Sequence, residues 1–290
     1  MAPALQLPRR RFLKLFAGCI GLSGSAYGSL HYATSYEPRH LEVTRTRIRL
    51  PHLQRVVRVV QLSDWHVSSD VPASFIHEAV TLALDQEPDI ICLTGDFITN
   101  AVLERAEMVR AFKRLSVAAP TFAVLGNHDG RPREEGTSDR VLADEMIAVI
   151  REGGARLLQN EAAQVDLTAG PSLTIAGLDD LWSGVLSPQK ALNARRARPQ
   201  PVVVLAHNPD VKSRLLDYDW DLLLCGHTHG GQVCLPFIEG RFTPVNDQST
   251  YSGYYRWQGR HLYVNRGVGN LHGVRFNCRP EVSLLELLPA

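Results

Sequence analysis

The stretch Gly226-His227-Thr228-His229-Gly230-Gly231-Gln232 is the starting point for interpreting this chain. It directly follows the apolar run 221–225, which predicts a short buried strand. The two histidines would then lie in the turn beyond the carboxyl end of that strand, where paired glycines let the backbone bend sharply and approach a ligand. Imidazole is the commonest metal-binding side chain, and this spacing can direct two rings at two neighbouring ions. Taken alone, the segment is equally well explained as a polar turn whose histidines bond only to the backbone.

The composition is that of a globular protein. The chain has 290 residues and 44% hydrophobic content, enough for one large or two small domains with a full core. The formal net charge is +1, but four of the 31 basic residues precede the first acidic residue, Glu37, and the remainder carries 27 basic against 30 acidic residues. We therefore expect no nucleic-acid partner. Four cysteines beyond the N-terminal region show no paired spacing and are expected to be buried thiols rather than disulfides: Cys92, Cys225, Cys234 and Cys278.

Residues 1–40 predict an export signal or an anchor. The basic run Arg9-Arg10-Arg11-Phe12-Leu13-Lys14 precedes the apolar residues 15–22. This order resembles a twin-arginine signal peptide, which implies the twin-arginine export machinery as a partner and a location in the periplasm or on the outer face of a bacterial cytoplasmic membrane. Small residues at 24–26 are suited to cleavage, but the run from Phe12 to about Tyr32 would also serve as a retained anchor. A disordered basic tail is the simpler alternative.

The second part, residues 41–290, is expected to be one domain. It opens at 41–50 with a strict alternation that places Val43, Arg45, Arg47 and Arg49 on one face of a strand. The simplest interpretation is a solvated edge strand that its charges protect from pairing. The alternative is contact of the arginines with anionic lipid headgroups beside an anchor.

Polar groups follow three successive predicted strands, at the point where each strand ends. The strands are expected at 56–62, 89–94 and 121–125, with helices at 72–87 and 102–115 between them. Directly after them come Ser63-Asp64-Trp65-His66, Gly95-Asp96 and Gly126-Asn127-His128-Asp129. In open α/β sheets the rim at the carboxyl ends of the strands is where ligands bind, so these groups are expected to meet there.

The second half of the chain is less regular. A helix is expected at 141–152, and the segments 156–158, 164–167 and 173–176 are interpreted as antiparallel strands of a second sheet. Asp179 and Asp180 are assigned to a solvent-facing turn, with a position near the rim as the alternative, and 186–201 is assigned to a helix and loop with a solvated arginine cluster. A strand at 201–206 ends at His207, and further strands are expected at 232–235, 261–265 and 282–287.

Seven oxygen or nitrogen donors thus lie just beyond predicted strands. They are Asp64, His66, Asp96, Asn127, His207, His227 and His229. Seven donors exceed what one tetrahedral ion needs and suit two ions that share a carboxylate. Because no thiolate is among them, the site favours Mn²⁺, Fe²⁺ or Fe³⁺, or Zn²⁺ over softer ions.

This ordered set resembles the calcineurin-like metallophosphoesterase superfamily, in a bacterial exported or membrane-associated branch. The match consists of an Asp-x-His, a Gly-Asp, a Gly-Asn-His with a following acid, a single His and a Gly-His-x-His, and it spans Asp64 to His229 with Trp65 as an unusually bulky residue in the first motif. Residues 263–267 and 275–278 extend the likeness over nearly the whole chain after residue 40. The resemblance implies an α/β fold, a four-layer α-β-β-α sandwich of two mixed sheets flanked by helices.

The resemblance also implies roles for the residues. Asp64, His66 and His229 would hold a first divalent or trivalent ion, Asn127, His207 and His227 a second, and Asp96 would bridge them. Two ions about 3.5–4 Å apart activate a shared water for in-line attack on phosphorus and neutralise the phosphoryl oxygens. His128 is expected to act on the leaving group as a general acid or hydrogen-bond donor, with Asp129 orienting its ring. A structural role for His128 is the alternative.

The expected function is a binuclear metal-dependent phosphoesterase, more specifically a phosphodiesterase. A sharper alternative is a membrane-associated hydrolase of the pyrophosphate bond in a phospholipid or a nucleotide-lipid such as UDP-diacylglucosamine, suggested by the anchor-like leader and the arginine-rich strand. A catalytically silent, metal-free scaffold belongs to a different class, although such scaffolds usually lack several of the donors that are all present here.

Overall fold

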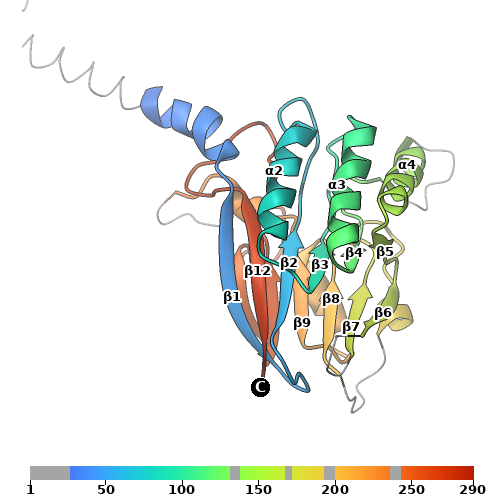
Figure 1. The fold of residues 1–290 in the computed structure, drawn as a ribbon. Helices are drawn as coiled ribbons and strands as arrows, with labels where there is room; N and C mark the ends of the chain where they lie inside the picture. Colours follow the sequence, from blue (N-terminus) through green and yellow to red (C-terminus); the bar gives the residue numbers. More distant parts are fainter. Residues whose placement is uncertain (1–26, 131–137, 167–171, 193–199, 236–242) are drawn as a thin grey trace, which may run out of the picture.

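Two six-stranded sheets form the centre of the molecule. The computed structural model describes residues 27–130, 138–166, 172–192, 200–235 and 243–290 (Figure 1). The strand order is β1-β12-β2-β3-β4-β5 in the first sheet and β10-β11-β9-β8-β7-β6 in the second. Both sheets contain parallel and antiparallel pairs, which confirms two mixed sheets.

The strands are short and mostly buried. In the first sheet they are β1 (Glu42–Leu50), β12 (Glu281–Pro289), β2 (Val57–Leu62), β3 (Ile90–Leu93), β4 (Thr121–Ala123) and β5 (Arg156–Leu157). In the second sheet they are β10 (Gly253–Trp257), β11 (Arg260–Val264), β9 (Leu222–Cys225), β8 (Val202–Leu205), β7 (Leu173–Gly177) and β6 (Glu161–Val165). Strands β3, β8 and β9 are buried along their whole length, as expected for parallel strands covered on both faces.

Helices cover the outer faces of both sheets. The helices α2 (Ala73–Leu84), α3 (Arg105–Ala118) and α4 (Ser138–Glu152) lie side by side on the first sheet (Figure 1). The second sheet packs its outer face against α5 (Pro188–Ala191) and the 3₁₀ segment Pro209–Leu215. A separate apolar cluster fills the space between the two sheets. The expected four-layer arrangement is confirmed, with a thinner fourth layer among the described residues.

Helix α2 illustrates how the sequence fixes these elements. Its apolar residues recur at helical spacing, so that Phe75, Ile76, Ala79, Val80 and Ala83 are buried against the first sheet. Pro72 precedes the first turn, where its missing N–H is not needed. The helix ends at Leu84, four residues before Pro88, which cannot continue a helix.

Three details differ from expectation. Strand β5 pairs in parallel with β4 and so extends the first sheet; it is not an antiparallel strand of the second. Residues 232–235 form no strand, because the backbone turns through a 3₁₀ segment, His229–Gly231, and within the described ranges makes a single bridge, from Val233 to Phe276. Strand β10, which was not predicted, pairs antiparallel with β11 at the edge of the second sheet.

The edge position of β1 is confirmed, and its arginines are exposed. Arg47 forms an ion pair with Glu286 on β12, which satisfies part of this face within the protein. Cys92, Cys225 and Cys278 are buried free thiols as expected, whereas Cys234 is partly exposed.

The N-terminal arm, residues 27–40, is helical and docks onto the loop 275–278. The Ala33 carbonyl accepts the N–H of Arg275 at 2.9 Å, and the buried Glu37 carboxylate accepts the N–H groups of Asn277 and Cys278. No described helix has the length and apolar character needed to cross a membrane. The predicted export signal falls mainly in residues 1–26, outside the described part of the chain.

Candidate metal centre

The loops after five parallel strands converge at one rim. They follow β2, β3 and β4 of the first sheet and β8 and β9 of the second. Six of the seven predicted donors form two compact groups there, Asp64 with His66 and His229, and Asp96 with His207 and His227. All six side chains are buried. Residues up to 165 positions apart in the sequence therefore meet as the sheet-rim rule predicts.

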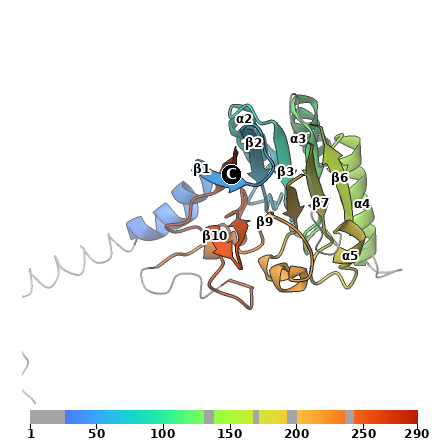
Figure 2. The same ribbon diagram turned by 90° about the horizontal axis from the view of Figure 1, so that it is seen from below.

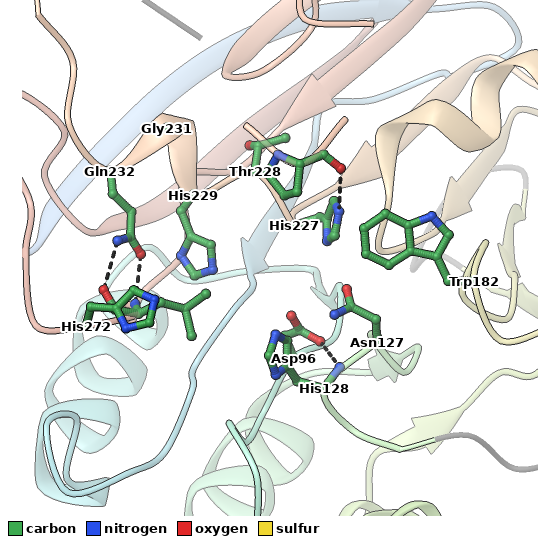
Figure 3. A pocket seen from close by; sticks show the side chains of 12 residues that line it. Asp96, Asn127, His128, Trp182, His227, Thr228, His229, Gly231, Gln232 and His272 are labelled. Atoms are coloured by element: carbon green, nitrogen blue, oxygen red, sulfur yellow. Dashed lines mark hydrogen bonds between the residues drawn. The ribbon is translucent and has the colours of Figure 1, made fainter. Parts of the chain in front are cut away.

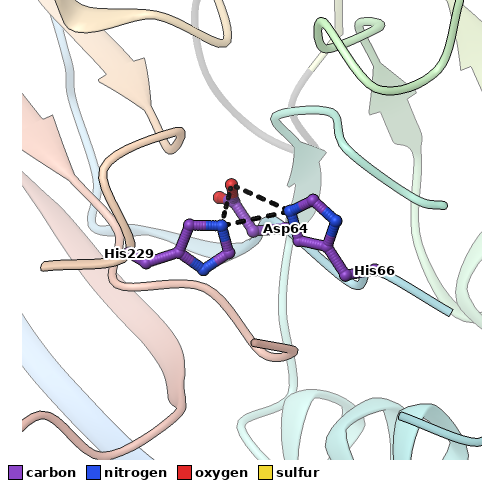
Figure 4. A group of neighbouring side chains, drawn as sticks. All are labelled: Asp64, His66 and His229. Carbon is purple, nitrogen blue, oxygen red and sulfur yellow. Dashed lines mark hydrogen bonds and ion pairs between the residues drawn. The ribbon is translucent and has the colours of Figure 1, made fainter. Parts of the chain in front are cut away.

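The first group has the spacing of ligands around a common point (Figure 4). The Nε2 atoms of His66 and His229 are 3.1 Å apart. Asp64 Oδ1 lies 3.4 Å from His229 Nε2 and 4.0 Å from His66 Nε2. Donor atoms bound tetrahedrally at ~2.0–2.1 Å would be about 3.3 Å apart. The group therefore fits a metal ion without a change of fold.

The second group is equally compact. His207 Nε2 lies 3.1 Å from Asp96 Oδ2 and 3.1 Å from His227 Nδ1. Asn127 lines the same pocket as Asp96 and His227, and its buried Oδ1 has no hydrogen-bond partner. A buried carbonyl oxygen without a partner is costly, so a cation at this position would satisfy it.

Asp96 connects the two groups. Besides its contact with His207, its Oδ2 lies 3.5 Å from His66 Nε2 in the first group. Its Oδ1 accepts the backbone N–H of His128 at 2.8 Å, which fixes the plane of the carboxylate. Burial alone would raise the pKa of Asp96, but His207 and His66 hold the pKa well below its usual range, so the group is a carboxylate.

Three of the four histidines are held neutral, as metal ligands must be. Burial lowers the pKa of His66 to about 4 and of His227 to about 3, and it lowers the pKa of His229 well below the usual value. For His207 the effect of burial is outweighed by Asp96, which raises the pKa. The carboxylates of Asp96, Asp64 and Asp180 all raise the pKa of His207, so the pocket carries a local negative charge that would also attract a cation.

The backbone at the donors is unusual. Five of the seven have positive φ: Asp64, His66, Asp96, His227 and His229, with values of 51°, 47°, 55°, 71° and 51°. Only a few per cent of non-glycine residues adopt this conformation, and it concentrates at functional sites. Asp64 and His66, two residues apart on one loop, belong to the same donor group, whereas His227 and His229 on another loop belong to different groups.

Tight packing supports these loops. A Cβ at Gly226 would lie 2.2 Å from Asp64 Oδ2, and one at Gly126 would lie 2.2 Å from Asp96 Oδ1, so neither position accepts a side chain. Trp65, the bulky residue between Asp64 and His66, is fully buried, with its ring centroid 4.7 Å from Phe112 of α3. The indole therefore anchors the ligand loop in the core beneath helix α3.

Asp129 does not orient His128, contrary to the sequence-based expectation. Its carboxylate instead accepts the backbone N–H groups of Asp96, Phe97, Ile98 and Gly126, at 2.8, 2.8, 3.3 and 2.8 Å. The Nδ1 atom of His128 lies 2.9 Å from the carbonyl oxygen of Thr99, which is thus the group that orients the ring. The sequence could not reveal this carbonyl, because any residue type supplies one.

Replacing Asp129 with Ala is expected to destabilise the metal-free protein by about 3 kcal/mol or more, because the buried N–H groups would lose their acceptor. At about 2–4 °C per kcal/mol for a domain of this size, Tm would fall by roughly 6–12 °C. Thermal unfolding, followed by circular dichroism in the presence of a metal chelator, measures this fall in Tm. Asp129→Asn, which keeps one acceptor oxygen, is expected to lose less. Equal Tm values for the wild type and Asp129→Ala would show that the carboxylate does not hold the loops.

A pocket of about 350 Å³ opens over the two groups (Figure 3). Asp96, Asn127, His227 and His229 line it, and His128 lines it without belonging to either group. Trp182 and Pro244 line it together with Leu271 and His272. The side chain of Gln232 holds the backbone at Leu271. Its Oε1 accepts the N–H of Leu271 at 2.7 Å, and its Nε2 donates to the Leu271 carbonyl at 2.9 Å.

The loop after β7 was misassigned from the sequence. Asp179 and Asp180 are buried, at 7% and 4% exposure, and do not form a solvent-facing turn. Burial raises the pKa of Asp179 to about 6 and also raises the pKa of Asp180. These residues follow β7, which pairs in parallel with β8. The rule that ligand-binding groups lie at the carboxyl ends of parallel strands, which located the seven donors, therefore also applied to them. Trp182, on the same loop, reaches the pocket.

Comparison with known proteins gives one consistent family. Residues 57–231 match the family model of calcineurin-like phosphoesterases. Phosphodiesterase YaeI of Escherichia coli is 39% identical over 284 residues, covering 97% of this chain and 100% of that protein. The uncharacterized metallophosphoesterase YkuE of Bacillus subtilis is 30% identical, with 97% and 98% covered. UDP-2,3-diacylglucosamine pyrophosphatase LpxG of Chlamydia trachomatis is 29% identical, with 89% and 92% covered. The chain thus belongs to the calcineurin-like phosphoesterase family and is a hydrolase of phosphoric esters.

Proposed function

We propose that this enzyme is a phosphodiesterase that uses two metal ions. The observation that carries the proposal is the position of Asp96, whose Oδ2 lies 3.5 Å from His66 in one donor group and 3.1 Å from His207 in the other. A single carboxylate between two compact ligand groups is the arrangement that a pair of ions requires.

In this proposal each donor group holds one ion. Asp64, His66 and His229 would hold the first, and Asn127, His207 and His227 would hold the second, with Asp96 available to both. Mn, Fe or Zn ions in these positions would supply an activated water and neutralise the charge of the phosphoryl oxygens. The protein keeps the ligands fixed through the left-handed backbone of the loops and the contacts of Gly126 and Gly226.

His128 assists departure of the leaving group. The hydrogen bond from its Nδ1–H to the Thr99 carbonyl leaves Nε2 available to the substrate. Its backbone N–H is used separately, to hold Asp96. Because Nδ1 already donates to Thr99, Nε2 carries a hydrogen only in the imidazolium form, and in this proposal it is that form that gives a proton or a hydrogen bond to the ester oxygen, without being a ligand itself.

The proposal is tested by metal analysis and substrate preference together. The purified full-length chain is expected to bind about two ions and to hydrolyse bis(p-nitrophenyl) phosphate at least ten times faster, in kcat/KM, than p-nitrophenyl phosphate. The diester is preferred because its second substituent can pack against the apolar and aromatic surface of Trp182, Pro244 and Leu271. A monoester lacks that substituent and carries a second negative charge. One ion per chain with full activity would overturn the binuclear centre, and faster hydrolysis of the monoester would overturn the diester preference.

A lipid-linked pyrophosphate is the second candidate substrate. It is favoured by the similarity to LpxG and by the arm that follows the apolar N-terminal segment, where Tyr27, Leu30 and Tyr36 are 73%, 62% and 50% exposed. Tyrosines and apolar side chains are enriched at membrane interfaces. Hydrolysis of such lipids in mixed micelles, with little activity on soluble diesters, would select this candidate.

Export through the twin-arginine route, with the enzyme in the periplasm or on the outer face of the membrane, belongs to the same proposal. Its support is the basic and apolar N-terminal sequence. Replacing Arg9 and Arg10 with Lys is expected to retain the protein in the cytoplasmic fraction, and unchanged fractionation would rule out this route.

A further inference from the structure

Trp182 exposes a large aromatic surface beside the donor groups. Its side chain is 47% exposed, whereas Trp65 and Trp220 are buried. It lines the pocket together with Asp96, Asn127 and His227 (Figure 3). Large aromatic side chains at a pocket are common anchors at binding sites.

The loop that carries Trp182 is rigidly held. Asp180 Oδ1 accepts the N–H of Trp182 at 2.8 Å, and the Asp180 carbonyl accepts both the N–H and the hydroxyl of Ser183, at 3.1 and 2.6 Å. These bonds close a turn around the tryptophan. Because Asp180 is itself 4% exposed, the turn is fixed from the protein interior and not by solvent-exposed contacts.

Asn160, at the start of the second sheet, ties both ends of this loop together. Its Oδ1 accepts the N–H groups of Asp179 and Ser187, at 3.3 and 2.9 Å, and its Nδ2 donates to the Val185 carbonyl at 3.0 Å. Asn160 adopts a positive φ of 54° and is 7% exposed. The indole is thus presented by a preorganised loop, which reduces the entropy lost when a ligand binds.

The ring stands next to a metal-ligand residue without being stacked on it. The centroids of Trp182 and His227 are 4.7 Å apart and the planes meet at 79°. This edge-to-face contact fixes the indole and still leaves its exposed surface at the pocket. A group bound there would be attached to the phosphorus over the donor groups by only a few bonds.

The surrounding wall favours a flat ring over an alkyl chain. Among the other described residues that line the pocket, only Pro244 and Leu271 are large and aliphatic, and most are histidines or polar residues such as Asn127, Thr228 and Gln232. An alkyl chain needs continuous apolar surface. A planar aromatic group gains from stacking on one indole while its edges remain compatible with polar neighbours.

We propose that Trp182 is the recognition platform for a planar aromatic substituent of the phosphate ester, an aryl group or a nucleobase. The inference rests on the proposed phosphodiesterase function and names its substrate class. Asp180 and Asn160 act as positioning residues that hold the platform beside His227.

The test uses the metal-loaded full-length chain and two competitive inhibitors that mimic diesters, methyl phenylphosphonate and methyl butylphosphonate. The wild type is expected to bind the phenyl compound at least ten times more tightly than the butyl compound. Trp182→Ala should abolish this preference and raise KM for bis(p-nitrophenyl) phosphate about tenfold, with kcat within threefold and metal content unchanged. Trp182→Phe should restore most of the preference. Tyr254→Ala removes a comparably exposed aromatic residue, 40%, on β10 and should leave the preference unchanged.

Binding without turnover separates this inference from the proposed function. Methyl p-nitrophenylphosphonate is expected to quench the intrinsic fluorescence of the wild type, and Trp182→Phe should lose most of that quenching. If the compound quenches the fluorescence of a protein that hydrolyses no diester, the aromatic binding site at Trp182 is supported and the proposed phosphodiesterase function is overturned. Active enzyme whose Trp182→Ala variant keeps the phenyl preference would overturn the platform alone. Loss of metal in Trp182→Ala would also overturn it, because Trp182 would then serve as a support for His227.

Discussion

Replacing Asp96 with Asn is expected to remove metal from both donor groups and to abolish hydrolysis. The carboxylate presents Oδ2 to His66 and His207 at 3.5 and 3.1 Å, and Oδ1 to the backbone N–H of His128. An amide of the same shape offers only one oxygen. Whichever way it is oriented, either the two histidines face an NH₂ group, which cannot bind a cation, or the N–H of His128 loses its acceptor. We expect kcat to fall by at least four orders of magnitude.

Metal analysis of the variant, together with its activity, measures this result. Asp89→Asn is a matched control, since Asp89 lies just before the opposite end of the same strand, β3, and binds the backbone N–H of Arg58 at 2.7 Å. This control should retain about two ions per chain and normal turnover. An Asp96→Asn protein that keeps two ions, or that is active without metal, would contradict the assignment of Asp96 as the shared ligand.

The positions of the donor residues were predictable because their sequence pattern follows from sheet geometry. Short apolar runs predicted β2, β3, β4, β8 and β9, and the carboxyl ends of parallel strands must share a rim. Each donor lies within a few residues of such an end, so Asp64 and His229 could be expected to meet although 165 positions separate them. The sequence pattern was sufficient to bring these residues together because their placement depends on which strands are parallel and where they end, and not on how individual side chains pack.

The remaining features depend on tertiary contacts that no local pattern specifies. The two-residue strand β5 could pair with either sheet, and its parallel register with Phe122 and Ala123 of β4 is set by how α4 packs. Asp179 and Asp180 have the composition of an exposed turn, but Asn160, in the bend before β6, accepts the backbone N–H of Asp179 and donates to its carboxylate. Asp180 is buried with the N–H of Trp182 bound to its carboxylate. For the same reason the bonding of Asp129 to four backbone N–H groups was not visible, since backbone donors are present at every position.

Replacing His128 with Ala is expected to leave the metals in place and to slow turnover by ~10²–10⁴-fold, the usual contribution of a positioned acid or base. Metal binding should persist because alanine keeps the main-chain N–H that holds Asp96 Oδ1 at 2.8 Å. The lost group is the imidazole alone, whose Nδ1 is committed to the Thr99 carbonyl. The Asp96 and His128 variants therefore separate metal binding from assistance to the leaving group.

The dependence on the leaving group distinguishes a proton donor from a merely structural residue. A phenolate leaving group needs a proton more than p-nitrophenolate does, so His128→Ala should reduce hydrolysis of a phenyl diester at least ten times more than that of the nitrophenyl diester. His272→Ala, which removes another histidine of the same pocket, should lower kcat less than tenfold with no such dependence. Equal losses on both esters would show that His128 acts through the shape of the site, because removal of an acid must cost most where the departing oxygen is most basic.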